Sequence, residues 1–189
     1  MVLYLSSGVV TYCTISDCTS HKAPAVWASL RPLLLSMSPE IKQVYIVSDS
    51  PTSQYRNKSI VHYLADYVKT STLDSMTWIF TETGHGKRPA DGVGSSVKKI
   101  IDDLCAYSPN TVINCAQHVL ERWPASSTIQ IHHYTTTAVE EAKSSLPSNF
   151  KLKSKPFGLG KCHEFSVNED DIQMKMLSDD KSSIRAMFQ

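Results

Sequence analysis

The chain has 189 residues, of which 41% are hydrophobic, enough for a packed core and too many for an intrinsically disordered protein. Its net charge is +1, so any nucleic-acid surface must be a local basic cluster. No apolar run reaches the roughly 18 residues of a membrane helix, and the first residues lack signal-peptide features. We therefore expect an intracellular protein without a membrane partner, located in the nucleus if it acts on DNA.

The hydrophobic pattern predicts strands and helices in an alternating order. These are strands over 2–5 and 9–15, a helix over 25–37, a strand over 44–47, a helix over 54–69, a strand over 76–81, helices over 91–106 and 111–122, a strand over 127–134 and a helix over 137–145. From residue 148 the sequence is rich in Lys, Ser, Pro and Gly, and no order is predicted for its tail. A hairpin followed by this alternation predicts an α/β fold, with a mixed sheet flanked by helices.

Two familiar kinds of site do not fit the sequence. The chain has five cysteines but no closely spaced pair of the kind that zinc sites need, so we expect reduced, mostly buried thiols. The segment 84–88, Gly-His-Gly-Lys-Arg, is similar to a phosphate-binding loop only in part. One residue separates its glycines where four are needed, and Arg88 stands where Ser or Thr is required.

Two carboxylates form the main candidate site. Asp49 directly follows the strand over 44–47, and Asp91 lies at the start of the helix after the next strand. If these strands are neighbours, both side chains share one edge of the sheet, where α/β proteins place their sites. Paired carboxylates can hold Mg²⁺ or Mn²⁺ together with substrate phosphates, which suits metal-assisted phosphoryl transfer. The alternative is that each Asp caps a helix N-terminus.

The loop before Asp91 offers groups that could bind phosphate. Lys87 and Arg88 flank a helix N-terminus, which is a natural anion site, and His85 could donate a hydrogen bond. Gly92 and Gly94 are costly in a helix and indicate close approach of either a ligand or a neighbouring element. A structural role for the His and plain packing of the glycines stay open as alternatives.

A second polar segment, 54–58, follows Asp49. Gln54 and Arg56 supply an amide and a cation that could contact a nucleic-acid backbone. A solvated helix face is the alternative.

Two blocks of the sequence resemble a known group. Residues 47–58, VSDSPTSQYRNK, and 78–94, WIFTETGHGKRPADGVG, resemble the blocks "SDG-x-x-x-QY-R/K-N" and "W-x-F-x-x-x-x-HGK-x-x-x-DG-I/V-G". Residues 14–17 resemble the "ISD" that ends an earlier strand there. These blocks occur in a group of animal proteins, mostly uncharacterised, that is related to DDE-type DNA transposases of mobile elements. The resemblance covers residues 4 to 105.

The resemblance implies a ribonuclease H-like core, here lacking its first strand. Asp49 would be the second catalytic carboxylate and Asp91 the third, whereas the first lies in a "DF-x-EN" block that does not occur in this sequence. The implied domains are an N-terminally truncated ribonuclease H-like core over 1–110, a helix and strand extension over 111–165 and a tail over 166–189.

The expected function is that of a transposase-derived domain, either a fragment or a domesticated copy. If active, it would cleave and join DNA phosphodiesters, with Asp49 and Asp91 holding Mg²⁺ or Mn²⁺ and with His85, Lys87 and Arg88 binding phosphate. Without the first carboxylate, catalysis is expected to be impaired. The alternative is a non-catalytic module on the same fold that binds nucleic acid or protein.

Overall fold

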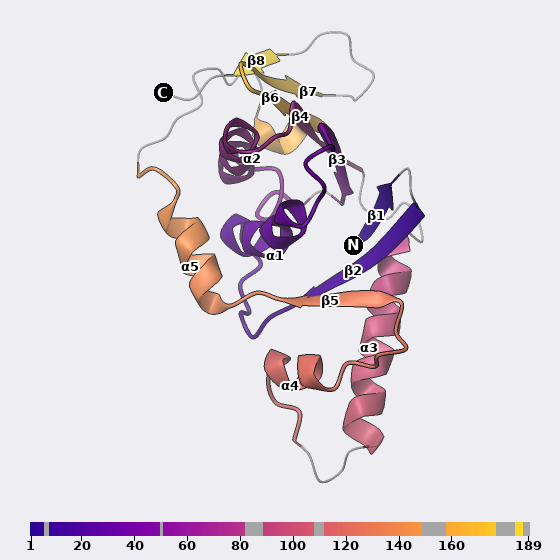
Figure 1. Cartoon of the computed structure of the whole chain (residues 1–189). Helices are drawn as coiled ribbons and strands as arrows, with labels where there is room; N and C mark the ends of the chain where they lie inside the picture. The colour runs from indigo at the N-terminus through magenta and orange to yellow at the C-terminus, as the bar shows by residue number, and fades with distance from the viewer. Residues whose placement is uncertain are drawn as a thin grey trace. The chain divides into compact units, whose positions relative to one another are not determined.

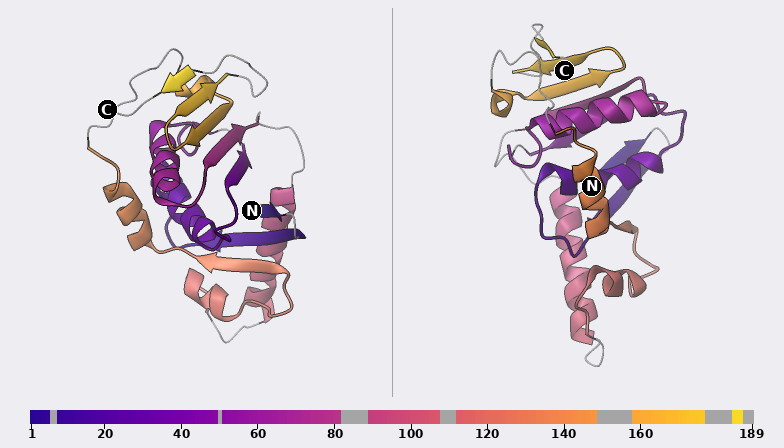
Figure 2. Two further views of the ribbon diagram at one scale, coloured as in Figure 1. Left: turned by 45° about the horizontal axis from the view of Figure 1, so that its top comes forward. Right: turned by 90° about the vertical axis from the view of Figure 1, so that its left-hand side faces the viewer.

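The computed structural model describes residues 1–5, 8–49, 51–81, 89–107, 112–148 and 158–176, together with the backbone of 184–186. In these segments the chain forms five α-helices and two mixed β-sheets (Figures 1 and 2), which confirms the α/β class. It divides into two compact units, each described here by itself. The first unit is Met1–Thr19 with Gly86–Ala138, and the second is Ser20–His85 with Val139–Gln189. The three sequence segments expected above stay a prediction.

The first unit contains a three-stranded sheet. Strands β1 (Val2–Leu5) and β2 (Gly8–Ile15) form the expected antiparallel hairpin, and β5 (Ile129–His133) adds parallel to β2. Gly8 has φ +140°, a backbone conformation that favours glycine. Helices α3 (Pro89–Tyr107) and α4 (Ala116–Glu121) complete this unit.

The core of the first unit is small. Its buried hydrophobic residues among those described are Val97, Ala116, Val119 and Ile129. Asp17 in the "ISD" block has a structural role, because its Oδ1 accepts a hydrogen bond from the Ala116 backbone N–H at 2.7 Å. This bond joins the segment after β2 to the start of α4.

The second unit contains a five-stranded sheet. Strands β3 (Gln43–Ser48) and β4 (Ser75–Phe80) are parallel, and β6 (Glu164–Asn168), β7 (Ile172–Lys175) and β8 (Ile184–Ala186) follow in antiparallel pairs. The strand order is therefore β3-β4-β6-β7-β8. Two expectations are corrected: the hairpin and β3 lie in different sheets, and the sequence after residue 148, for which no strand was expected, supplies β6, β7 and β8.

Helices α1 (Ala23–Leu35), α2 (Lys58–Thr70) and most of α5 (Thr136–Ser144) belong to the second unit. Helix α2 packs against β6 and α1 packs against α2, as Figure 2 shows for α2. Helix α2 begins at Lys58 rather than at the expected residue 54, because the Asn57 side chain accepts hydrogen bonds from the N–H groups of Ser59 and Ile60.

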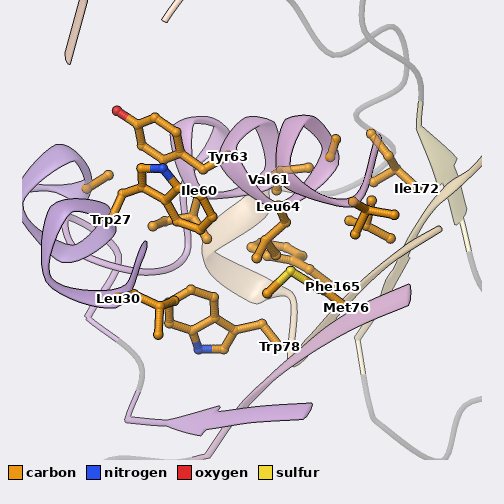
Figure 3. Packing of buried hydrophobic residues seen from close by; sticks show 14 of the residues in the cluster. Trp27, Leu30, Ile60, Val61, Tyr63, Leu64, Met76, Trp78, Phe165 and Ile172 are labelled. Carbon is orange, nitrogen blue, oxygen red and sulfur yellow. The ribbon is translucent and has the colours of Figure 1, made fainter. Parts of the chain in front are cut away.

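One face of the five-stranded sheet carries the core of the second unit. Leu64 of α2 points toward Met76 and Phe165 of the sheet (Figure 3), and all three side chains are fully buried. The other members from the strands are Val44, Trp78, Phe80, Val167, Ile172 and Met174. Phe80 meets Phe165 edge to face, with ring centres 5.0 Å apart. These strand residues alternate in sequence, as one buried face requires.

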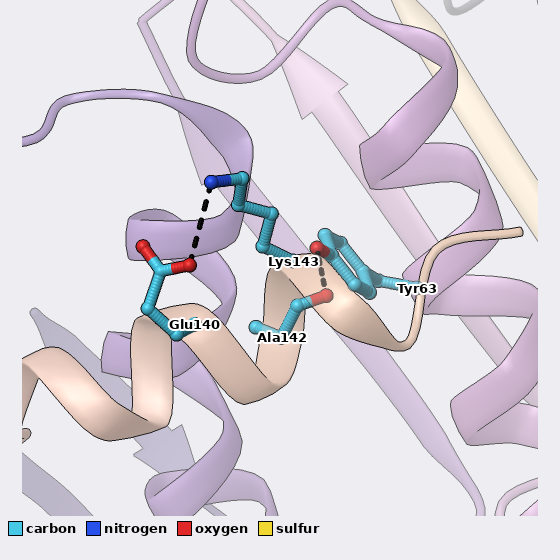
Figure 4. Close-up of polar contacts among 4 residues, drawn as sticks. All are labelled: Tyr63, Glu140, Ala142 and Lys143. Carbon is cyan, nitrogen blue, oxygen red and sulfur yellow. Dashed lines mark hydrogen bonds and ion pairs between the residues drawn. The ribbon is translucent and has the colours of Figure 1, made fainter. Parts of the chain in front are cut away.

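Tyr63 connects α2 to α5 (Figure 4). Its hydroxyl donates a hydrogen bond to the Ala142 carbonyl at 2.6 Å, and its ring stacks on Trp27 with centres 5.1 Å apart. Burial raises the pKa of Tyr63, so the hydroxyl stays a donor at neutral pH. The nearby Glu140–Lys143 ion pair is exposed and adds little stability.

Candidate site at the carboxyl end of β3

Asp49 follows β3 directly and is exposed at the carboxyl end of the parallel pair β3 and β4. The backbone leading to it is held by several bonds. The Thr81 N–H and hydroxyl both donate to the Ser48 carbonyl, at 2.9 and 3.0 Å. The Trp78 indole donates to the Ser48 hydroxyl at 2.9 Å, and that hydroxyl donates to the Asp49 carbonyl at 2.7 Å. The Asp49 carboxylate therefore projects from a fixed strand end. It does not cap α2, because Asn57 does so.

Tyr55 forms the side of this site. Its ring is half-buried and lies on Trp78, with ring centres 5.5 Å apart. Burial raises the pKa of the Tyr55 hydroxyl, and the negative charge of Asp49 raises it further. Asp49 thus has a protonated hydroxyl in its neighbourhood, which can donate a hydrogen bond to an oxygen ligand. Tyr55 was not among the expected site residues, although it lies inside the first resemblance block.

Arg56 is a structural residue of the loop between β3 and α2. Its Nη1 donates to the carbonyls of Gly160 and Cys162, at 2.8 and 3.3 Å, and its guanidinium lies 5.7 Å from the centre of the Phe80 ring. Gln54 is half-buried in the same loop, which is not helical. A solvated helix face therefore does not describe this segment. The expected contact of Gln54 and Arg56 with DNA stays a prediction.

Asp91 lies in the first turn of α3, where the helix dipole favours a negative charge. Outside the helix's own backbone and within the described segments, an added Cβ at Gly92 or Gly94 would meet no atom within 4 Å. Asp91 belongs to the first unit and Asp49 to the second. Their expected meeting at one sheet edge stays a prediction.

The remaining expected phosphate ligands, His85, Lys87 and Arg88, lie outside the described residues. In the described segments, no three His, Cys, Asp or Glu side chains are placed to hold a metal ion together. Asp49 alone offers one hard oxygen ligand. This donor fits a Mg²⁺ ion that is completed by substrate phosphate and water, and it does not fit a closed protein site.

The cysteines are free thiols, as expected, but their burial differs from the expectation. Cys162 is fully buried, Cys13, Cys18 and Cys115 are half-buried, and Cys105 is exposed. Burial raises the pKa of Cys162 to about 11, which makes this thiol unreactive at neutral pH.

A family model described as a domain of unknown function, DUF8701, matches residues 1–178. The chain belongs to this family. The match runs from β1 through β7, so both sheets of the DUF8701 chain contain strands of the family domain. No curated protein and no solved structure matched in the two other comparisons. Among the described helices, none has the length and apolar character needed to cross a membrane.

Proposed function

We propose that the DUF8701 chain is a transposase-derived domain that acts on DNA through the carboxyl end of β3 and β4. One observation carries the proposal. Asp49 is exposed directly after a parallel strand, on a backbone that hydrogen bonds between Ser48 and Thr81 hold in place. The carboxyl ends of parallel strands are where α/β sheets place their sites.

The proposal includes a ribonuclease H-like core. Three features support it: the antiparallel hairpin β1–β2, the parallel unit β3-α2-β4 that follows α1, and helix α3 after β4. Their order along the chain is the order that the resemblance implies after its first strand. One feature does not follow from the resemblance: β1 and β2 lie in one sheet, whereas β3 and β4 lie in another.

The groups on the chain have distinct proposed roles. Asp49 would supply one carboxylate ligand to Mg²⁺ or Mn²⁺. The Tyr55 hydroxyl would donate a hydrogen bond to a phosphate oxygen. The ion would neutralise phosphate charge and acidify a bound water. Asp91 as a second metal ligand, and His85, Lys87 and Arg88 as phosphate ligands, belong to the same proposal.

The test is metal-dependent DNA binding and cleavage by the whole chain. Labelled duplex and single-stranded DNA are titrated in Mg²⁺, in Mn²⁺ and with chelator, and the products are separated by size. We expect Asp49→Asn to weaken metal-dependent binding, and any cleavage, by about tenfold or more. Asp66→Asn, an exposed carboxylate on α2, is the matched control and should change neither. Binding and cleavage that are unaffected by Asp49→Asn would remove the site, and an absence of DNA binding would remove the proposal.

A second candidate is a non-catalytic binding module on the same fold. The bonding of Arg56 favours it, because this cation holds two backbone carbonyls of its own chain and so contributes to a rigid scaffold. DNA binding with a steep salt dependence and without cleavage would support a nucleic-acid module. Binding to protein alone would point to protein partners.

A further inference from the structure

Trp78 contacts the candidate site from inside the core. Its side chain is 2% exposed and belongs to the hydrophobic core of the second unit (Figure 3). Its indole N–H donates to the Ser48 hydroxyl at 2.9 Å, and its ring contacts the Tyr55 ring, with centres 5.5 Å apart. Ser48 directly precedes Asp49. One buried residue therefore touches Tyr55 directly and reaches Asp49 through Ser48.

The bond from Trp78 sets the direction in which the Ser48 hydroxyl donates. An indole N–H can only donate, so the hydroxyl oxygen accepts from it and the hydroxyl proton has to point elsewhere. It points to the Asp49 carbonyl, at 2.7 Å. Ser48 is only half-buried, so without the indole bond its hydroxyl would be free to turn toward water.

Hydrogen bonds hold the peptide groups on both sides of the Asp49 Cα. Thr81 binds the Ser48 carbonyl through its N–H and its hydroxyl, which holds the peptide group before Asp49. The Ser48 hydroxyl binds the Asp49 carbonyl, which holds the peptide group after it. The φ and ψ angles of Asp49 are the rotations of these two groups about its Cα. Holding both groups therefore fixes the direction in which the Asp49 side chain leaves the backbone.

We propose that Trp78 is a positioning residue: it directs the Asp49 carboxylate through Ser48, and it places the Tyr55 hydroxyl by ring contact. The inference rests on the proposed function and adds the residue that arranges its site. A metal ion and its phosphate bind tightly only where their ligands are held at the required spacing. Groups that orient a metal ligand without touching the metal commonly contribute about tenfold or more to metal affinity. The alternative is that Ser48 only satisfies the buried indole N–H, with no effect on binding.

The test follows the fluorescence anisotropy of a labelled DNA duplex with the whole chain as Mn²⁺ is raised from zero. The readout is the Mn²⁺ midpoint, the concentration that gives half-maximal DNA binding, so no cleavage is needed. We expect Ser48→Ala and Trp78→Phe each to raise this midpoint by about tenfold, because each removes one partner of the Trp78–Ser48 bond. The double variant should be no worse than Trp78→Phe alone, because both changes interrupt one chain of bonds. Ser48→Thr keeps the hydroxyl and should recover most of the affinity.

Trp27→Phe is the matched control. Trp27 is a buried tryptophan of α1 in the same core, and its ring stacks on Tyr63. Its replacement also removes buried aromatic surface, so thermal unfolding followed by circular dichroism should show a loss of stability for both tryptophan variants. The Mn²⁺ midpoint of Trp27→Phe should stay that of the parent, because this residue has no part in holding Ser48.

The outcomes separate this inference from the proposed function. If the parent shows no Mn²⁺-dependent DNA binding that Asp49→Asn weakens, the proposed function fails and the inference fails with it. If Asp49→Asn raises the midpoint but Ser48→Ala does not, the site stands and the positioning role of Trp78 is wrong. Ser48→Ala decides this even where Trp78→Phe does not fold. A midpoint that Trp27→Phe shifts as much as Trp78→Phe also overturns the role, because the effect would then be general loss of stability.

Discussion

Replacing Arg56 by Met tests whether this residue holds the second unit together. Arg56 Nη1 bonds to the carbonyls of Gly160 and Cys162, which lie 104 and 106 residues further along the chain. A hydrogen bond from a charged group contributes about 1.5–3 kcal/mol when well formed, and less where solvent screens it, as at the exposed Gly160 contact. The guanidinium above Phe80 adds about 0.5–1 kcal/mol.

Arg56→Met should therefore lower the free energy of unfolding by about 2 kcal/mol, which corresponds to a fall in Tm of about 4–8 °C for a chain of this size. Met keeps an unbranched apolar side chain at this position, so the loss reports the cation and its donors. Thermal unfolding followed by circular dichroism measures it. Arg31→Met, at an exposed arginine of α1, is the control and should stay within about 0.5 kcal/mol of the parent. If Arg56→Met changes stability no more than this control, the structural role of Arg56 is wrong.

Three further changes test other contacts of the second unit. Gly160→Ala should cost about 1 kcal/mol in urea unfolding, because its Cβ would lie 3.2 Å from the Thr52 methyl group, and adding Thr52→Ser should recover most of this loss. Asn57→Ala removes the cap of α2 and should cost about 1–2 kcal/mol by the same measurement, whereas an unchanged midpoint would contradict the cap. Because folding raises the pKa of Cys162 from 9.0 to about 11, stability should fall as the pH rises across this interval, and Cys162→Ala should show a shallower fall.

The first half of the fold was largely predictable from the sequence. Strands β2, β3 and β4 and helix α3 have clear periodic patterns, and each was expected within a few residues of its observed bounds. Periodicity does not reveal which strands pair, and for this reason one sheet was expected where two are found. Strands β6 and β7 have only five and four residues. Their place in the sheet depends on the pairing of β6 with β4, a strand far earlier in the chain, and of β7 with β6.

The site was predictable in part for a similar reason. Asp49 follows a strongly apolar strand, so its position at the strand end could be expected. The start of α2 was placed too early because residues 54–57 were taken as its first turn, whereas the Asn57 side chain caps the helix. The bonding of Arg56 could not be expected, because its acceptors are backbone carbonyls, which leave no pattern in a sequence.

The discontinuity of the second unit has a consequence for how this protein is made. Thr77 of β4 pairs with Ser166 of β6, 89 residues later, so this pairing cannot form until the chain has been synthesised beyond β6. Until then the apolar side of β4, with Met76, Trp78 and Phe80, has no β6 beside it. Long-range pairing of this kind slows folding and prolongs the exposure of apolar surface, which favours aggregation. We expect synthesis of the soluble protein to depend on chaperones that bind nascent chains.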